Sequence, residues 1–174
     1  MKEIELIPIS GVAYFVVSRT GVVSEILDFS YLDSNKEYLQ LIHDEREFKK
    51  ETTLMWKNMQ GFLDKERIII NDQRVRSEVK LVDIIYRGLD DVPHVLFFIE
   101  FRGTLVNGLN TIETYTEEEE LEYDVEAYWK FPHKTRIIEV ITPMEYEINK
   151  NFILLWSRKG NVIGGYEKIT FELR

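Results

Sequence analysis

The sequence contains no cysteine, so disulfide bonds, zinc thiolate sites and thiol nucleophiles are all excluded. It also contains no uninterrupted apolar run near the roughly 18 residues that a membrane-spanning helix needs. The first residues, Met1 to Glu5, carry charges where a signal peptide would carry an apolar segment. We therefore expect a protein of a reducing compartment, and a cytoplasmic location is the simplest interpretation.

Positive charge is scarce, because 22 lysines and arginines stand against 31 aspartates and glutamates, for a formal net charge of -9. Such a field repels nucleic acids and anionic membranes, so neither is expected as a partner. The densest basic candidate is Arg74, Arg76 and Lys80, which Glu78 interrupts. Abundant glutamate and lysine without cysteine match the composition bias of heat-adapted proteins, so a thermophilic source is one expectation.

Proline is also scarce, and turn-forming residues stand between strand-like runs of β-branched and aromatic residues from about Arg67 to the C-terminus. The predicted turns lie at residues 107–108, 131–133, 149–151 and 159–161. This pattern predicts one antiparallel meander. With 174 residues and no linker, the whole of 1–174 is expected to form a single domain.

The first third of the sequence predicts one strand and two helices. Residues Ile4–Ser18 predict an irregular edge strand, and Val22–Phe29 predict a short helix. In Asn35–Leu63, apolar side chains recur every three, four or seven residues, which predicts one long helix buried along a stripe. Ser34 and Glu37 have the spacing of a capping box at its start.

This order of elements predicts an α+β fold, in which a long antiparallel meander sheet of about seven strands curves around one long helix. The arrangement resembles the helix-grip and cystatin-like architectures. A closed antiparallel β-barrel capped by helices is the alternative fold.

The Asn107-Gly108 turn predicts a hairpin that places Arg102 opposite Glu113. Continuing the same register would place apolar residues opposite glutamates. We therefore predict a β-bulge or a strand break within 116–120.

An acidic row is the most unusual local feature. Its alternate positions are Glu118, Glu120, Glu122, Asp124 and Glu126, which would share one face of a single extended strand. Clustered carboxylates can bind Mg²⁺ or Ca²⁺, although a solvated sheet face gives the same alternation and is the preferred interpretation. No cofactor is predicted, and a divalent cation stays as the alternative.

A matching basic ladder includes Arg74 and Arg76. If these arginines faced Glu122, Asp124 and Glu126 inside a closed barrel, the tunnel could bind a polyphosphate and its metal ion. The alternative function is therefore a metal-dependent polyphosphate-processing enzyme. Triphosphate tunnel enzymes open with a Glu-x-Glu-x-Lys run, whereas this sequence has Glu-Ile-Glu-Leu-Ile there and lacks the lysine.

Catalytic motifs are otherwise missing, because His43, His94 and His133 have no nucleophile or second metal ligand at a recognised spacing. An enzyme is therefore less expected than a non-catalytic binding domain. We predict a crevice between helix and sheet for an apolar small molecule or a partner segment, lined by residues such as Met55, Phe98 and Trp129. A structural subunit of a larger assembly is a further alternative.

The run Val95–Phe101 is apolar on both strand faces in its first half. One long helix can cover only one face of a sheet, so the other face needs a different cover. We therefore expect a symmetric homodimer that packs sheet against sheet.

Overall fold

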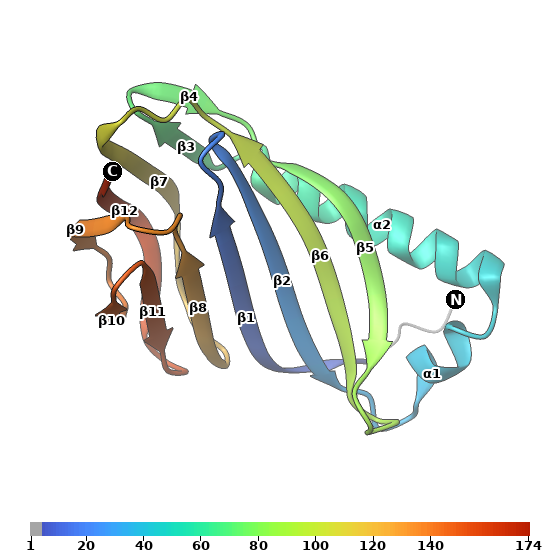
Figure 1. Ribbon diagram of the computed structural model, residues 1–174. Helices are drawn as coiled ribbons and strands as arrows, with labels where there is room; N and C mark the ends of the chain where they lie inside the picture. Colours follow the sequence, from blue (N-terminus) through green and yellow to red (C-terminus); the bar gives the residue numbers. More distant parts are fainter. Residues whose placement is uncertain (1–4) are drawn as a thin grey trace.

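A computed structural model describes residues 5–174 and shows a mostly β fold (Figure 1). Its elements, in chain order, are β1 (Ile7–Val17), β2 (Val22–Leu32), α1 (Glu37–Leu41), α2 (Glu45–Leu63), β3 (Arg67–Ile70), β4 (Gln73–Val75), β5 (Glu78–Tyr86), β6 (Pro93–Arg102), β7 (Gly108–Glu120), β8 (Asp124–Lys130), β9 (Arg136–Ile141), β10 (Glu145–Asn149), β11 (Phe152–Ser157) and β12 (Val162–Leu173). The expected first strand began at Ile4, which lies outside the described residues.

The strands form two sheets. The larger has seven strands in the order β10-β11-β8-β1-β2-β6-β5, and the smaller has five in the order β4-β3-β7-β12-β9. Neighbouring strands are antiparallel except β1 and β8, which are parallel. Within residues 5–174 neither sheet closes on itself, so the alternative of a closed barrel is wrong. The expected antiparallel pairing is present, but the single meander curved around one helix is not.

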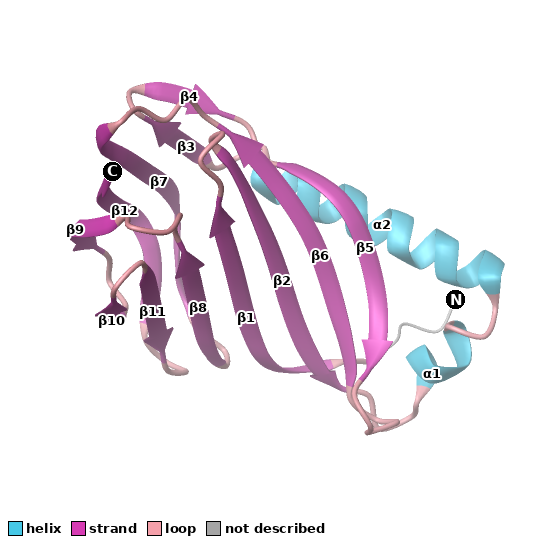
Figure 2. Cartoon of the chain, in the orientation of Figure 1, coloured by secondary structure: helices cyan, strands magenta, loops and turns pink. Residues whose placement is uncertain are grey.

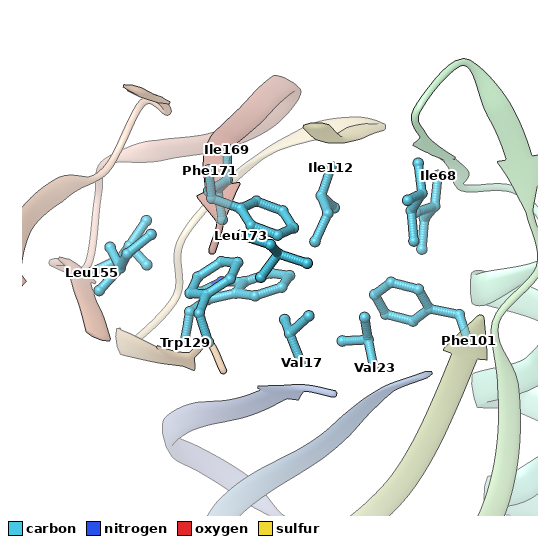
Figure 3. Close-up of a cluster of buried hydrophobic side chains, with 13 residues drawn as sticks. Val17, Val23, Ile68, Phe101, Ile112, Trp129, Leu155, Ile169, Phe171 and Leu173 are labelled. Carbon is cyan, nitrogen blue, oxygen red and sulfur yellow. The ribbon is translucent and has the colours of Figure 1, made fainter. Parts of the chain in front are cut away.

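One face of the larger sheet, which we call the inner face, has two different covers (Figure 2). The smaller sheet packs over one end and helix α2 packs along β5 at the other. Each cover has its own core cluster. In the first, Phe171 and Leu173 of β12 lie against Trp129 of β8 and Val17 of β1 (Figure 3). In the second, helix side chains pack on β5 and β6.

Two helices occupy the segment in which one long helix was expected. Helix α2 begins at Glu45 because the Asp44 side chain accepts hydrogen bonds from the backbone N–H groups of Arg46, at 3.0 Å, and Glu47, at 3.1 Å. The short α1 is preceded by Asp33, whose carboxylate accepts from the N–H of Tyr38, so the expected capping role of Ser34 is wrong. No helix in the described part of the chain has the length and apolarity to cross a membrane.

Helix α2 also binds the exposed edge of the larger sheet. Gln60 donates to the carbonyl of Ser77 and accepts from the N–H of Val79, and the Trp56 indole donates to the Val79 carbonyl. These bonds occupy backbone groups of the edge strand β5 beside a register shift between Val79 and Leu81. The helix therefore protects an edge that could otherwise pair with another chain.

The predicted helix over Val22–Phe29 is wrong, because this segment is strand β2. Its alternating residues pair with β1 through a tight turn in which Gly21 has φ +82°. A side-chain Cβ at Gly21 would lie 1.9 Å from the Gly103 carbonyl oxygen, so only glycine fits. The turn joins β1 and β2 in a hairpin, and the other edge of β2 pairs with β6.

The predicted hairpin at Asn107-Gly108 is also wrong, because β6 and β7 belong to different sheets. Arg102 pairs with Val22 rather than with Glu113. The buried Asn110 side chain holds the crossing segment by bonding both the N–H and the carbonyl of Val106. The Asn110 side chain thus satisfies backbone groups of this segment that hairpin pairing was expected to satisfy.

The bulge expected within 116–120 is present, although the partner strand is β12. The register shifts so that Ile163 pairs with Glu119 and Gly165 pairs with Thr116. Gly164 has φ +92° at this point, and a Cβ there would lie 2.3 Å from the Glu117 carbonyl oxygen. A bulge is favoured here because glycine can adopt the required backbone conformation.

We propose that the outer face of the larger sheet pairs with a second copy of the chain. No described element covers this face, and Tyr14, Val16 and Phe152 are 44%, 48% and 46% exposed on it. Charges of both signs accompany them, such as Glu126 and Lys130 on β8. A two-fold axis can place such acidic and basic groups opposite each other.

Sedimentation equilibrium at tens of micromolar protein should return twice the chain mass of 20.7 kDa. The Val16→Glu variant should return a monomer, because it adds a buried charge to each half of the interface. Leu109→Glu, at an exposed position on β7 in the smaller sheet, is the matched control and should remain dimeric. A wild-type chain that stays monomeric would contradict this assembly.

Gln60→Leu should lower the free energy of unfolding by about 1 to 3 kcal/mol, because it leaves buried backbone groups of β5 without partners. Asn58→Leu, on an exposed position of the same helix, is the control for the added apolar side chain. Urea denaturation followed by circular dichroism measures both variants. Equal stabilities would show that the edge bonds contribute nothing.

Candidate functional site

A cavity of about 300 Å³ lies between the two sheets, beside the loop that follows α2. Strands β1, β2, β6, β8 and β11 of the larger sheet form one wall. Strands β3, β7 and β12 of the smaller sheet form the other, together with the loops near Glu66, Tyr123 and Met144. The site is therefore built by segments from nearly the whole length of the chain.

Small residues on the inner face make this space. Ala13 of β1 is the cross-strand partner of Ala127 of β8, and Gly11 precedes them on the same face. A Cβ on Gly11 would lie 3.2 Å from both the Phe29 and the Tyr123 rings, so this position leaves room for two aromatic side chains. Larger residues at these positions would fill the layer between the sheets.

Aromatic rings form the deep end of the cavity. Phe15 and Trp129 stack with ring centroids 4.0 Å apart and an interplanar angle of 5°. Trp129 also stacks on Phe131, which is fully buried in the first core cluster. Phe101 adds another ring to the lining. This end offers an apolar, polarisable wall to a ligand.

Two carboxyl groups enter this apolar space without a partner among residues 5–174. Glu25 lies on the inner face of β2, and Glu66 lies in the loop between α2 and β3. Burial, with a smaller contribution from the negative charge of Glu66, raises the pKa of Glu25 to about 8. Burial also raises the pKa of Glu66 to about 7. Near neutral pH at least one of them is therefore protonated.

A third carboxyl, Glu167 of β12, lines the opposite wall. Thr142 donates a hydrogen bond to Glu167 Oε1 at 2.5 Å, which favours the charged form. Burial outweighs this bond, so the pKa of Glu167 is raised. The hydroxyl groups of Thr114 and Thr116 on β7 add neutral polar groups to the same wall.

The opening of the cavity lies near the connection from β7 to β8. Glu119 is a lining residue there that is exposed to solvent, and Glu126 lies beside it with its side chain on the outer face, where it accepts from the Tyr128 hydroxyl. Tyr123 lies between them in the chain, and burial together with the charges of Glu119 and Glu122 raises the pKa of its hydroxyl. The entrance thus carries negative charge, and the interior is mostly apolar.

The three residues predicted to line a helix-sheet crevice do not meet at one site. Trp129 lines the cavity between the sheets. Met55 packs in the second core cluster between α2 and the larger sheet. Phe98 pairs with Ile26 and Leu81 on the outer face. The available space lies between the sheets and not under the helix.

The predicted acidic row is divided between two sheets, because β7 ends at Glu120 and β8 begins at Asp124. Glu122 is exposed in the connecting loop, and Asp124 accepts a hydrogen bond from the Lys159 N–H. Glu126 accepts from the Tyr128 hydroxyl. The expectation that these carboxylates share one strand is wrong, and no metal-binding group of side chains occurs within residues 5–174.

The two arginines of the proposed polyphosphate tunnel are also exposed. Arg76 forms an ion pair with Asp64 at 3.0 Å, next to the end of α2. Arg74 lies on the short strand β4 at the edge of the smaller sheet. These arginines and the three carboxylates of the hypothesis therefore do not face one enclosed space.

The sequence did not reveal the half-buried Glu25, because Val22–Phe29 was predicted to be a helix. As a strand, this segment alternates Val23, Glu25, Leu27 and Phe29 on one face, which is a charged residue inside an apolar row. That pattern was a usable signal for Glu25. Glu66 and Glu167 carry no comparable signal, because only tertiary packing encloses them.

Comparison with known proteins finds no matching family model and no matching curated protein. Among solved structures, the chain is similar to the NMR structure of the folded domain of LppM from Mycobacterium tuberculosis, with a TM-score of 0.48 and 10% identity. The alignment covers 99% of this chain and 95% of that chain.

The raised carboxyl pKa values predict how stability depends on pH. Glu25 keeps its proton in the folded state between its ordinary pKa of 4.5 and about 8, where the unfolded chain has lost that proton. The free energy of unfolding should therefore fall as pH rises through this interval, and Glu66 adds to the fall up to about pH 7.

Glu25→Gln should raise the free energy of unfolding at about pH 8 by about 1 to 3 kcal/mol and change it little at about pH 5. Urea denaturation at the two pH values measures the difference. Glu122→Gln makes the same charge change at an exposed position and should leave the pH dependence unaltered. The same pH dependence in Glu25→Gln and wild type would contradict the assignment.

Proposed function

We propose that this chain is a non-catalytic binding protein that takes an apolar small molecule into the cavity between its two sheets. The observation that carries the proposal is the cavity itself, whose volume of about 300 Å³ is lined mainly by apolar and aromatic side chains. Natural ligand sites have about this volume and a few polar groups that orient the ligand. Here the orienting groups are the glutamates and threonines.

The small residues of the inner face support this proposal. Packed protein interiors contain few voids larger than a water molecule, because unfilled space forfeits dispersion contacts. Residues such as Ala13 and Ala127 leave this space open in a layer that is otherwise filled by rings and branched side chains. A ligand would restore the contacts that the folded chain lacks.

The proposal can be tested with N-phenyl-1-naphthylamine. This neutral apolar dye fluoresces more strongly in an apolar environment than in water. Titration of the dye into wild-type protein should give a saturable rise in emission with one site per chain. Ala127→Phe should weaken binding at least about tenfold, because the added ring occupies the space. Val16→Phe adds similar bulk on the outer face of β1 and should bind the dye normally.

Circular dichroism and urea denaturation of both variants establish that each is folded before binding is compared. Two further variants, Ala13→Leu and Ala13→Phe, fill the same space from the neighbouring strand in steps. Their affinities should fall in the order of side-chain volume. Absence of saturable binding in the wild type, or binding in Ala127→Phe and Ala13→Phe as tight as in the wild type, would refute the function.

A further inference from the structure

We propose that the cavity selects apolar molecules that carry a protonated amine and that it disfavours apolar molecules that carry a carboxylate. This inference rests on the binding function proposed above and names the chemical class of its ligand. Three observations support it: the sign of the charged groups at the cavity, the absence of described hydrogen-bond donors to Glu25 and Glu66, and the rings beside these two carboxyls.

The titratable groups that line the cavity are all acidic, and they come from both sheets and from two loops. They are Glu25 of β2, Glu66 of the α2–β3 loop, Glu119 of β7, Tyr123 of the β7–β8 loop and Glu167 of β12. Among the described residues, no lysine, arginine or histidine contributes to the lining. A ligand carboxylate would therefore find no positive charge in the lining, whereas a cation could pair with any of the carboxyls that ionises.

Glu25 and Glu66 also lack hydrogen-bond donors. Among residues 5–174 no hydrogen-bond donor or ion-pair partner meets either carboxyl group. Both residues are half-buried, and the burial that raises their pKa values removes hydration that no described donor replaces. The N–H groups of an ammonium ion would supply the missing donors and leave the rest of the ligand in the apolar part of the cavity.

The rings nearest these carboxyls suit the same ligand. Phe15 is the cross-strand partner of Glu25, and Phe15 stacks on Trp129. The faces of aromatic rings attract cations, and ring edges and aliphatic side chains accommodate an alkyl or aryl body. One molecule can therefore place its ammonium group at the carboxyls and its apolar body against the rings.

Binding of such a ligand should release a proton. The ligand enters as an ammonium ion, and the protonated carboxyl of Glu25 or Glu66 gives its proton to the solvent, so an ion pair replaces a neutral acid. No covalent bond of the ligand forms or breaks. The raised pKa values of the two groups mean that a proton is present for release near neutral pH.

Competition against N-phenyl-1-naphthylamine tests the selectivity with three ligands of equal chain length. Decylamine, decanol and decanoate are compared at about pH 7, below the concentration at which each self-associates. The affinity of decylamine, measured by dye displacement, should be at least about tenfold higher than the affinity of decanol. The affinity of decanoate should be lower than that of decanol. Decanol reports the apolar contribution alone.

Variants assign the selectivity to the two carboxyls. Glu25→Gln and Glu66→Gln, alone and combined, should bring decylamine affinity down toward that of decanol and leave decanol affinity nearly unchanged. Glu122→Gln is the matched control, since it removes the same charge at an exposed position that does not line the cavity. Its preference for decylamine should equal that of the wild type.

Isothermal titration calorimetry in phosphate and in Tris gives an independent measurement. Because the two buffers differ in ionisation enthalpy, the difference in binding heat counts the protons released. Decylamine binding to wild type should release protons, and this release should disappear in the Glu25→Gln/Glu66→Gln variant. Decanol binding should release none.

The outcomes separate this inference from the function on which it rests. If the dye and decanol bind but decylamine has no advantage, the amine selectivity is wrong and the apolar binding function stands. If the advantage persists in the double variant, the two carboxyls are not its source and the inference fails. If neither the dye nor decanol binds, both the proposed binding function and the amine selectivity are wrong.

Discussion

The inner face of the larger sheet is longer than any single cover, and the rest of the structure depends on how it is buried. The smaller sheet covers one end and α2 covers the other, so the chain must change from one cover to the other along β2 and β6. The cavity lies at this junction, where Glu66 belongs to the loop between the helix and the smaller sheet. The cavity is therefore the space that neither cover fills, and it is the candidate ligand site.

Local patterns predicted the strands of the C-terminal part but not how they pair. The alternation in Val95–Phe101 correctly indicated a strand buried on its inner face, and the glycine-rich region near Gly164 allowed the expected bulge. Pairing depends on contacts between distant residues, and adjacent strands in sequence were assumed to be adjacent in space. The parallel pairing of β1 with β8 violates that assumption and has no local signal.

The candidate site was predictable only in part for a related reason. Trp129 was recognised as a large ring on an alternating strand, and it lies in the cavity wall. Met55 and Phe98 have equally apolar patterns, but one faces the helix-sheet core and the other the outer face. A side chain's place on a strand face follows from local sequence, whereas the identity of the layer above that face follows from topology.

The half-buried glutamates distinguish the candidate site from space that is simply unfilled. A well-packed core would favour apolar residues at Glu25 and Glu66, because a carboxyl without donors is disfavoured in both of its protonation states. Glu25 opposes the apolar pattern of its strand face, and such conflicts between a residue and its surroundings are most frequent at functional sites. Since any ligand that binds only the folded chain also stabilises it, a partner for these carboxyls would recover stability that the empty cavity forgoes.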